Sequence, residues 1–372
     1  MLRIYADHRF VKPGQRHVVM LYPFWGKLPE DPRNPASGRF DRYVAQGRSL
    51  FALETLRDAD VALLPAPWED VRGDADARLL AHELAAEARA AGKPVVAFFW
   101  SDSTEPLPLD DALVFRTSLH ASRRRPADFA MPAWSEDLVE RYLGGELSLR
   151  PKRERPVVGF CGWAGAAGPP ATAAPLRLST GQRAGRSLKR RLQVLAAALG
   201  IKRRDTTRAR VLRLLAGSGL IDTNFIIRDR YLGGPVILKE AADAEMAQRI
   251  RLEFVQNMVE SDYVLCVRGV GNYSYRLYET LSCGRIPIFV NTDCVLPYDF
   301  AVDWKQYCVW VEEHEIVQVA EKVAAFHAGL SEHDFGDLQR ASRRFWQERL
   351  SPEGFFTAFH QHLPLPVAAK AQ

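Results

Sequence analysis

The chain has 372 residues, 47% of them hydrophobic and 26% charged, so it can bury two ordinary cores and is not of the disordered class. It contains no run of eighteen or more apolar residues, and charged side chains interrupt the first thirty positions, so we expect a cytosolic protein without a membrane span. The five cysteines are widely spaced and form no CxxC pair, which favours buried thiols over a zinc site.

The first half of the chain alternates short apolar runs with amphipathic stretches, which is typical of a parallel sheet with crossover helices. A helix is predicted over 77–91, because Leu80, Leu84 and Ala88 recur at helical spacing and Gly92 follows as a helix-ending residue. Strands are predicted at 2–6, 18–22, 61–64, 95–100 and 113–115.

The alternation breaks near residue 150, where a polar stretch with two prolines suits a hinge, and then starts again. In the second half, strands are predicted at 157–161, 263–267, 286–290 and 309–311. Helices are predicted at 187–200, 241–259, 316–328 and 335–346, and a loop without periodicity at 163–182.

These elements predict an α/β protein of two domains and a tail. We expect an N-terminal Rossmann-like domain over 1–150, which faces the acceptor, and a C-terminal Rossmann-like domain over 151–335, which binds a nucleotide sugar. The helix and tail over 336–372 are expected to pack back toward the first domain.

The most informative stretch, residues 261–290, reads as strand, loop, helix and strand. Gly269 and Gly271 allow the backbone to approach a ligand, and Ser274 can cap the helix that follows, so this turn is suited to binding a diphosphate. Arg268 ends the strand beside that helix start and can grip phosphate oxygens with its planar fork, and Arg276 can assist from the first turn.

Glu279 follows one turn later and could accept hydrogen bonds from ribose hydroxyls, as acidic residues do in dinucleotide-binding folds. The alternative is a structural ion pair with Arg276 or Arg285. Tyr273 and Tyr275 flank the expected helix cap, and we include them among the predicted donor-binding residues.

This stretch resembles the exostosin family of glycosyltransferases, in which a Cys-x-Arg-Gly segment precedes a helix that carries Arg and Glu, and a Gly-x-Ile-Pro-Val strand follows. Here those places are taken by Cys266-Val-Arg268-Gly269, by Arg276-Leu-Tyr-Glu279 and by Gly284-Arg-Ile-Pro287. The close match covers about residues 254–304.

The resemblance implies a GT-B type fold, with two Rossmann-like domains and a cleft between them. It also implies an inverting transfer from a nucleotide sugar, most simply a nucleoside diphosphate sugar, with no bound metal and no further cofactor. Animal members are anchored in the Golgi membrane, and no anchor is seen here. We therefore expect a glycan or lipid-linked glycan acceptor and a role in surface polysaccharide assembly in the cytoplasm or at the inner face of the membrane.

An inverting transfer needs a base on the acceptor side, and loops after the first-domain strands are the places to look for it. We favour Asp102, which follows an apolar strand and two aromatic residues, although it could instead cap its own turn. Glu69 is a second candidate in the loop after 61–64, and His120, which titrates near neutrality, is a third.

Aromatic side chains of the first domain could stack on an acceptor sugar, and Trp25 and Trp68 are the predicted contacts, although an aromatic run more often belongs to a core. Eleven Lys or Arg residues lie within 183–213 against one acid, and this region could contact donor phosphates, an anionic acceptor or a membrane surface. Arg186 is the predicted phosphate contact within it, with a solvated basic face as the alternative.

Two Asp-Ala-Asp triplets, at 58–60 and 74–76, raise the question of a metal-dependent transferase, but neither follows an apolar strand, so no metal site is predicted. A nucleotide-sugar epimerase or hydrolase on the same fold is the alternative enzyme class. A nucleic-acid-binding protein is a third reading, disfavoured because no basic-aromatic module appears, and we expect no nucleic-acid partner.

Overall fold

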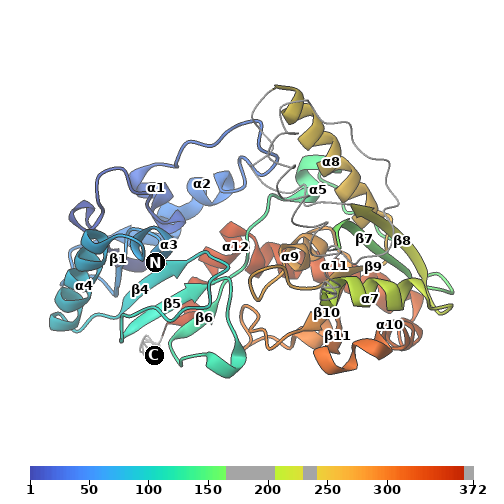
Figure 1. Cartoon of the computed structure of the whole chain (residues 1–372). Coiled ribbons are helices and arrows are strands. Elements are labelled where there is room, and N and C mark those ends of the chain that lie inside the picture. Colours follow the sequence, from blue (N-terminus) through green and yellow to red (C-terminus); the bar gives the residue numbers. More distant parts are fainter. Residues whose placement is uncertain (165–205, 229–240, 364–372) are drawn as a thin grey trace, which may run out of the picture.

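A computed structural model of the chain describes residues 1–164, 206–228 and 241–363, with side chains from residue 245 in the last range. The chain forms two parallel β-sheets, each flanked by helices (Figure 1). The predicted α/β fold with two Rossmann-like domains is therefore confirmed.

The first sheet has the strand order β2-β1-β3-β4-β5-β6, and every neighbouring pair is parallel. Its strands are β1 (Leu2–Tyr5), β2 (Phe51–Leu53), β3 (Val61–Leu63), β4 (Val95–Phe99), β5 (Ala112–Arg116) and β6 (Asp128–Ala130). Parallel strands need crossover connections, and these bring helices to both faces of the sheet.

Alternate side chains of β4 show how the two faces of the first sheet are covered. Val96 and Phe98 face a cluster that includes α1 (Tyr22–Trp25), α2 (Asp41–Leu50) and α12 (Pro352–Thr357). Ala97 and Phe99 face the opposite cluster, which includes α3 (Trp68–Val71) and α4 (Ala75–Ala90). Because both faces are buried, the strand is apolar throughout.

The second sheet has the order β11-β10-β9-β7-β8, again with parallel pairs. Its strands are β7 (Val157–Trp163), β8 (Asp222–Arg228), β9 (Tyr263–Cys266), β10 (Ile286–Asn291) and β11 (Val309–Glu312). Read from the β8 edge, the second strand of this half along the chain comes first in the sheet, followed by the first, third, fourth and fifth strands. The first sheet begins with the same order. In each sheet the order in which strands are added therefore reverses between the first and third strands.

Helices also cover both faces of the second sheet. One cluster joins Leu265 to α7 (Thr207–Ala216) and α10 (Val319–Ala328). On the other face, Val264 packs with α8 (Ala241–Val259), and Cys266 packs with α9 (Tyr275–Ser282). A short helix, α5 (Leu138–Tyr142), contacts both α8 and α9 from the segment that joins the two sheets.

The C-terminal segment returns to the first sheet. α11 (Glu332–Phe345) continues into a π-helical turn over Trp346–Leu350, and Ser351 then caps α12 by accepting from the N–H of Gly354. Phe355, Phe356 and Phe359 are buried in the same cluster as Phe98 of β4. Figure 1 shows α12, in red, lying against the first sheet.

One predicted strand is wrong. Residues 18–22 are buried as an apolar run should be, but they form a 3-10 turn over Val19–Leu21 that leads into α1. Pro23 stands in the first turn of that helix, where its missing N–H has no intrahelical partner to lose. The helices predicted over 77–91 and 241–259 are confirmed as α4 and α8.

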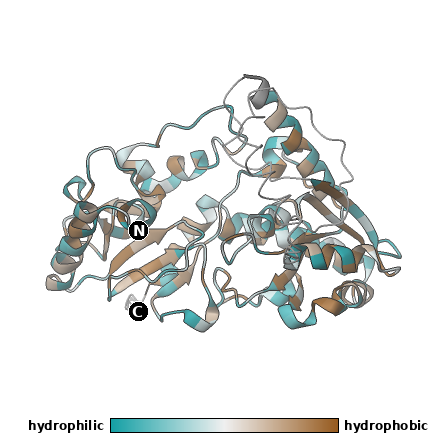
Figure 2. Ribbon diagram, viewed as in Figure 1, coloured by the Kyte–Doolittle hydropathy of each residue, from teal (hydrophilic) through white to brown (hydrophobic). Residues whose placement is uncertain are grey.

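Hydropathy follows the layers of the fold, with apolar strands inside and mixed or polar helices outside (Figure 2). In the part of the chain that the structure describes, no helix combines the length and the hydropathy that a bilayer span requires.

Candidate functional site

The loop over 267–274 lies at the point where the strand order of the second sheet reverses, between β7 and β9. It follows β9, whose neighbour β7 is the first strand of this sheet along the chain. In open α/β sheets, ligands bind beyond the carboxyl ends of the strands at this point. The predicted donor loop therefore occupies the usual ligand position of its sheet.

Two arginines flank the start of α9. Arg268 is exposed, and its Nη1 lies 3.5 Å from Asn272 Oδ1, at the outer limit of a hydrogen bond. Arg276 donates from Nη2 to the carbonyl of Cys161 at 2.9 Å and lies over the ring of Phe160, both in β7. Its buried Nε has no hydrogen-bond partner among the described residues. Both guanidinium groups thus lie at the β7 and β9 ends with capacity to bind an oxyanion.

Gly271 is the point at which this loop meets the first domain. Its N–H donates to Asp102 Oδ1 at 3.2 Å. A Cβ at Gly271 would lie 2.6 Å from that oxygen and 2.6 Å from a ring carbon of Tyr273, whereas a Cβ at Gly269 would come no closer than 4.0 Å to Arg208 Nη2. The approach of Asp102 therefore requires glycine at 271 but not at 269.

Asn272 anchors the loop more deeply, since only 1% of the residue is exposed. Its backbone N–H donates to Ser118 Oγ at 2.8 Å, and its Nδ2 lies 3.1 Å from the carbonyl of Leu119. The same Nδ2 is 3.1 Å from His120 Nδ1, which lies 3.4 Å from Asp293 Oδ2. The structure therefore places His120 in the contact between the two domains.

Ser274 occupies the predicted N-cap position of α9, with tyrosines on either side of it, but the expected cap hydrogen bond is absent. Burial, with Tyr275 and Asp102 nearby, raises the pKa of Tyr273. Tyr275 is 38% exposed, and its hydroxyl accepts from Trp100 Nε1 at 3.0 Å. Tyr275 therefore links the start of α9 to the loop after β4.

Glu279 is buried and ion-paired, but not with either arginine considered from the sequence. Its Oε1 lies 2.7 Å from Arg251 Nη1 on α8. Arg251 also donates from Nε to Oε1 of Glu136 at 2.8 Å. The carboxylates of Glu279 and Glu136 thus bracket one guanidinium where α9, α8 and the segment before α5 meet.

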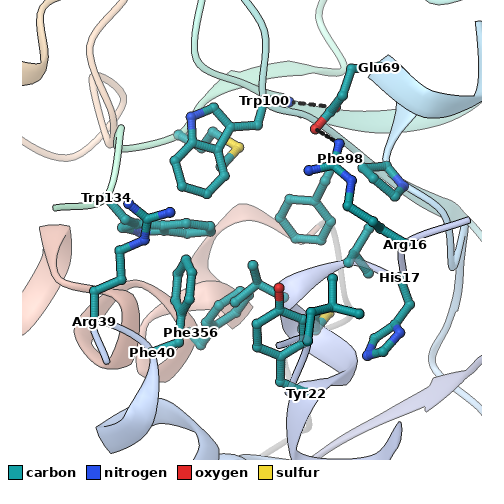
Figure 3. Close-up of a pocket in the computed structure, with 16 residues that line it drawn as sticks. Arg16, His17, Tyr22, Arg39, Phe40, Glu69, Phe98, Trp100, Trp134 and Phe356 are labelled. Atoms are coloured by element: carbon teal, nitrogen blue, oxygen red, sulfur yellow. Dashed lines mark hydrogen bonds and ion pairs between the residues drawn. The ribbon is translucent and has the colours of Figure 1, made fainter. Parts of the chain in front are cut away.

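A pocket of about 120 Å³ lies in the first domain, where β3, β4 and β6 end (Figure 3). Such a volume holds several water molecules. Aromatic side chains from separate segments dominate its lining, namely Tyr22, Phe40, Phe98, Trp100, Trp134 and Phe356. Aromatic faces of this kind can stack on the apolar faces of sugar rings.

Glu69 is the acid of this pocket. Its side chain is 20% exposed, and its Oε2 accepts the backbone N–H of Trp100 at 3.1 Å. Burial raises the pKa of Glu69 to about 7, with Arg16 acting in the opposite direction. A carboxyl group that titrates near neutrality can act as a general base.

Two hydrogen-bond donors of the pocket have no partner among the described residues. They are the buried Nε of Arg39 and the Nε1 of Trp134, a residue that is 2% exposed. The Arg39 guanidinium lies 4.9 Å from the ring of Phe40 and 5.2 Å from that of Trp100 (Figure 3). Unpaired donors suit a ligand that carries acceptor oxygens.

Comparison with known proteins finds similarity in the second half of the chain. Residues 175–326 match the Exostosin GT47 domain. Over 86 residues the chain is 30% identical to Exostosin-1 of Drosophila melanogaster, an alignment that covers 23% of this chain and 11% of that protein. The second half of the chain is therefore similar to proteins of the exostosin family. Over 66 residues the chain is also 32% identical to the probable glucuronosyltransferase GUT1 of Oryza sativa subsp. japonica, covering 18% and 16% of the two chains.

Each of these alignments spans less than a fifth of the relative's own length. Among solved structures, the crystal structure of TarM aligns with 73% of this chain and 55% of its own, at 10% identity and a TM-score of 0.29. The exostosin match contains the donor loop and α9 but none of residues 1–164, so the pocket around Glu69 lies outside it.

The structure distributes the predicted acceptor and donor residues unevenly. Trp68 is 3% exposed in the core between the first sheet and α4, and Trp25 stacks on His8 at 3.8 Å, so neither lines the pocket. Trp134 and Arg39, which do line it, carried no sequence signal because each stands alone in its segment. Arg186 and the helix expected at 187–200 lie outside the described residues.

Members of the two Asp-Ala-Asp triplets take part in ion pairs and a helix cap. Asp60 pairs with Arg3 at 2.6 Å, while Asp74 caps α4 and pairs with Lys12 at 2.7 Å. Within residues 1–164, 206–228 and 241–363, no three His, Cys, Asp or Glu side chains come together in a group that could hold a metal ion.

Proposed function

We propose that the chain is an inverting, metal-independent glycosyltransferase that moves a sugar from a nucleoside diphosphate sugar to a glycan or lipid-linked glycan, in the assembly of a surface polysaccharide. The observation that carries this proposal is the contact between two candidate sites. Trp100 holds Glu69 through its backbone N–H, and its indole N–H reaches Tyr275 at the start of α9. A base in an aromatic pocket thus adjoins a loop suited to binding a diphosphate.

On the donor side, Arg268 and Arg276 would neutralise the diphosphate as it leaves, together with the backbone at the start of α9. The exposed Arg268 is suited to gripping phosphate oxygens with two donors. The exostosin match over 175–326, which contains both arginines, supports this assignment.

On the acceptor side, Glu69 would take the proton of the attacking hydroxyl group. The acceptor oxygen forms a bond to the anomeric carbon from the face opposite the diphosphate while the bond from that carbon to the phosphate oxygen breaks. The bonding pair leaves with the nucleoside diphosphate, so the configuration inverts. Arg39 and Trp134 line the pocket and would lie against the acceptor sugar.

The sequence favours Asp102 as the base, whereas the geometry favours Glu69. Asp102 is exposed, and its carboxylate accepts the Gly271 N–H. Glu69 lines the pocket, and burial raises the pKa of its carboxyl group to about 7. We therefore propose that Asp102 positions the donor loop and that Glu69 removes the proton.

The test begins with a screen of nucleotide sugars for thermal stabilisation of the purified chain, repeated with EDTA. We expect one nucleoside diphosphate family to bind in the presence of EDTA, and its sugar to be transferred only when an acceptor glycan is added. Full-rate release of nucleotide without acceptor would instead identify a hydrolase. Failure of every nucleoside diphosphate and nucleotide sugar to bind would refute the proposal.

A further inference from the structure

Asp70 holds Arg16 with both carboxylate oxygens. Arg16 Nε lies 2.7 Å from Oδ2, and Nη2 lies 2.6 Å from Oδ1. The segment that carries Arg16 is also tied to α3, because Gln15 Nε2 donates to the Asp70 carbonyl at 3.2 Å. A two-pronged guanidinium–carboxylate pair of this kind fixes the orientation of the arginine as well as its position.

The same guanidinium lies close to the pocket acid. Arg16 Nη2 is 3.7 Å from Glu69 Oε1, within ion-pair range but beyond a hydrogen bond. Figure 3 shows Glu69 and Arg16 side by side at the pocket. Consecutive helical residues point in different directions, so Glu69 lines the pocket while its neighbour Asp70 pairs with Arg16. A small movement of Arg16 would exchange one carboxylate for the other.

We propose that Asp70 is a positioning residue for Glu69, because it holds the Arg16 guanidinium in a two-pronged pair and so keeps that cation from closing on the Glu69 carboxylate. A full ion pair would stabilise the ionised form of Glu69 and make it a weaker base. The catalytic consequence rests on the proposed function, whereas the exchange of partners by Arg16 does not.

The negative charge of Asp70 itself also raises the pKa of Glu69, so the effect of Asp70→Asn has to be compared with and without Arg16. Burial raises the pKa of the Tyr22 hydroxyl and lowers that of the His17 ring, so both are neutral near pH 7. Arg39 lines the pocket among the rings of Phe40 and Trp100. Trp100 contributes only its backbone N–H to Glu69.

The test follows the titration of Glu69 without using turnover. The free energy of unfolding is measured from pH 4 to pH 9 for the wild type and Glu69→Gln, and for Asp70→Asn and the Glu69→Gln/Asp70→Asn double variant. Within each pair, with and without Glu69→Gln, we compare the free energies of unfolding. Their difference changes with pH between the pKa of glutamate in the unfolded chain and the pKa of Glu69 in the folded protein, and it is constant at higher pH. We call the pH above which this difference no longer changes the pH of levelling. We expect levelling near pH 7 in the wild-type background and at least about one pH unit lower in the Asp70→Asn background.

Further variants test whether Arg16 causes this shift in the titration of Glu69. In the Arg16→Gln background the cation is absent, so Asp70→Asn should lower the pH of levelling much less than it does when Arg16 is present, because only the charge of Asp70 itself is lost. Should Asp70→Asn fail to fold, Arg16→Gln alone is expected to move levelling above the wild-type value. Asp111→Asn is the matched control, because Asp111 pairs with Arg89 at 3.0 Å on the exposed surface, and it should leave levelling unchanged.

An unchanged titration in Asp70→Asn would overturn the inference, as would an equal shift in the variant that also lacks Arg16. Turnover separates this inference from the proposed function. If levelling moves as expected but the acid limb of the rate profile does not follow it, Asp70 positions Arg16 as proposed and the assignment of Glu69 as the base fails.

Discussion

Two neighbouring acids in the first turn of α3 have different environments and are expected to have different roles. Glu69 is enclosed by the aromatic pocket, and burial raises its pKa to about 7. Asp70 instead forms a two-pronged pair with Arg16. Burial thus leaves Glu69 largely protonated at pH 6, and a carboxyl group with a raised pKa is a common feature of catalytic sites.

The pH dependence of turnover is the first residue-scale prediction. Glu69 accepts a proton only when ionised, so the rate should fall as the pH drops below about 7, the value at which half of this group is protonated. Glu69→Gln cannot accept the proton, and we expect kcat to fall by roughly 10²- to 10⁴-fold with nucleotide affinity unchanged. Initial rates across pH 5 to 9, with calorimetric titration of nucleotide, measure both effects.

Glu105→Gln is the control for this prediction, because Glu105 lies in the loop after β4, is exposed and pairs with Arg72 at 2.6 Å. Its rate profile should match that of the wild type. A Glu69→Gln variant that keeps wild-type kcat would show that another group removes the proton.

The second residue-scale prediction concerns Arg268. Charge-assisted hydrogen bonds to phosphate contribute about 1.5–3 kcal/mol, so Arg268→Ala should weaken binding of the preferred nucleoside diphosphate by roughly 10- to 100-fold. Arg268→Lys should recover only part of this loss, because an ammonium group lacks the planar fork. Arg33→Ala, at an exposed pair with Asp31 in the first domain, serves as the control. Equal affinities for Arg268→Ala and the wild type would exclude this contact.

At the scale of elements, the loop over 267–274 serves both domains. Its sequence is typical of a phosphate-binding turn, and its buried half docks on the loops after β4 and β5 through Gly271 and Asn272. Arg268 remains exposed at the other end. The loop therefore couples the position of the donor site to the contact between domains.

Alanine substitutions at the two glycines should separate these roles. A Cβ at Gly271 would lie 2.6 Å from Asp102 Oδ1, so Gly271→Ala must displace the loop or the first domain, at a cost of about 1–3 kcal/mol. At Gly269 there is space for a methyl group, and Gly269→Ala should unfold at the wild-type urea concentration. Equal midpoints for the two variants would show that the Asp102 contact does not constrain the loop.

The sequence predicted those elements whose pattern is long enough to show a period. α4 and α8 have sixteen and nineteen residues and were found, whereas β2 and β6 have three residues each and were missed. Residues 18–22 were assigned to a strand because a short buried run is apolar in either conformation. Length is not sufficient, because β3 has only three residues but is apolar throughout and was predicted, whereas the seven residues of β8 begin with three polar ones and were not.

The candidate site was predictable in one domain only. The donor loop is continuous in sequence, so its arginines and glycines could be found as a motif. The pocket is assembled from segments around Tyr22, Arg39, Glu69, Trp100 and Trp134, which only the tertiary fold brings together. The sequence also assigned Trp68 to the acceptor site, and its burial beside α4 shows how core and ligand-binding aromatics look alike in one dimension.

At the scale of the whole molecule, the two sheets share a strand order, and the C-terminal segment joins them. α11 packs on the second sheet, whereas α12, which follows it after a π-helical turn, completes a face of the first. The first half of the sequence therefore does not contain its full core. Side chains supplied more than 200 residues later also line its pocket, as Phe356 does.

This arrangement predicts that the last helices control the stability of the first domain. Phe359 has no exposed surface, and its ring centroid lies 4.7 Å from that of Phe115 in β5. Phe359→Ala should therefore lower the free energy of unfolding by about 3–5 kcal/mol. Hydrogen exchange should show the loss of protection in β1 to β6 ahead of β7 to β11, because the second sheet has its own core.

Phe300→Ala is the control, since Phe300 is 49% exposed and its replacement should lower the free energy of unfolding only slightly. Protection lost first from the second sheet would show that the C-terminal segment does not belong to the first core.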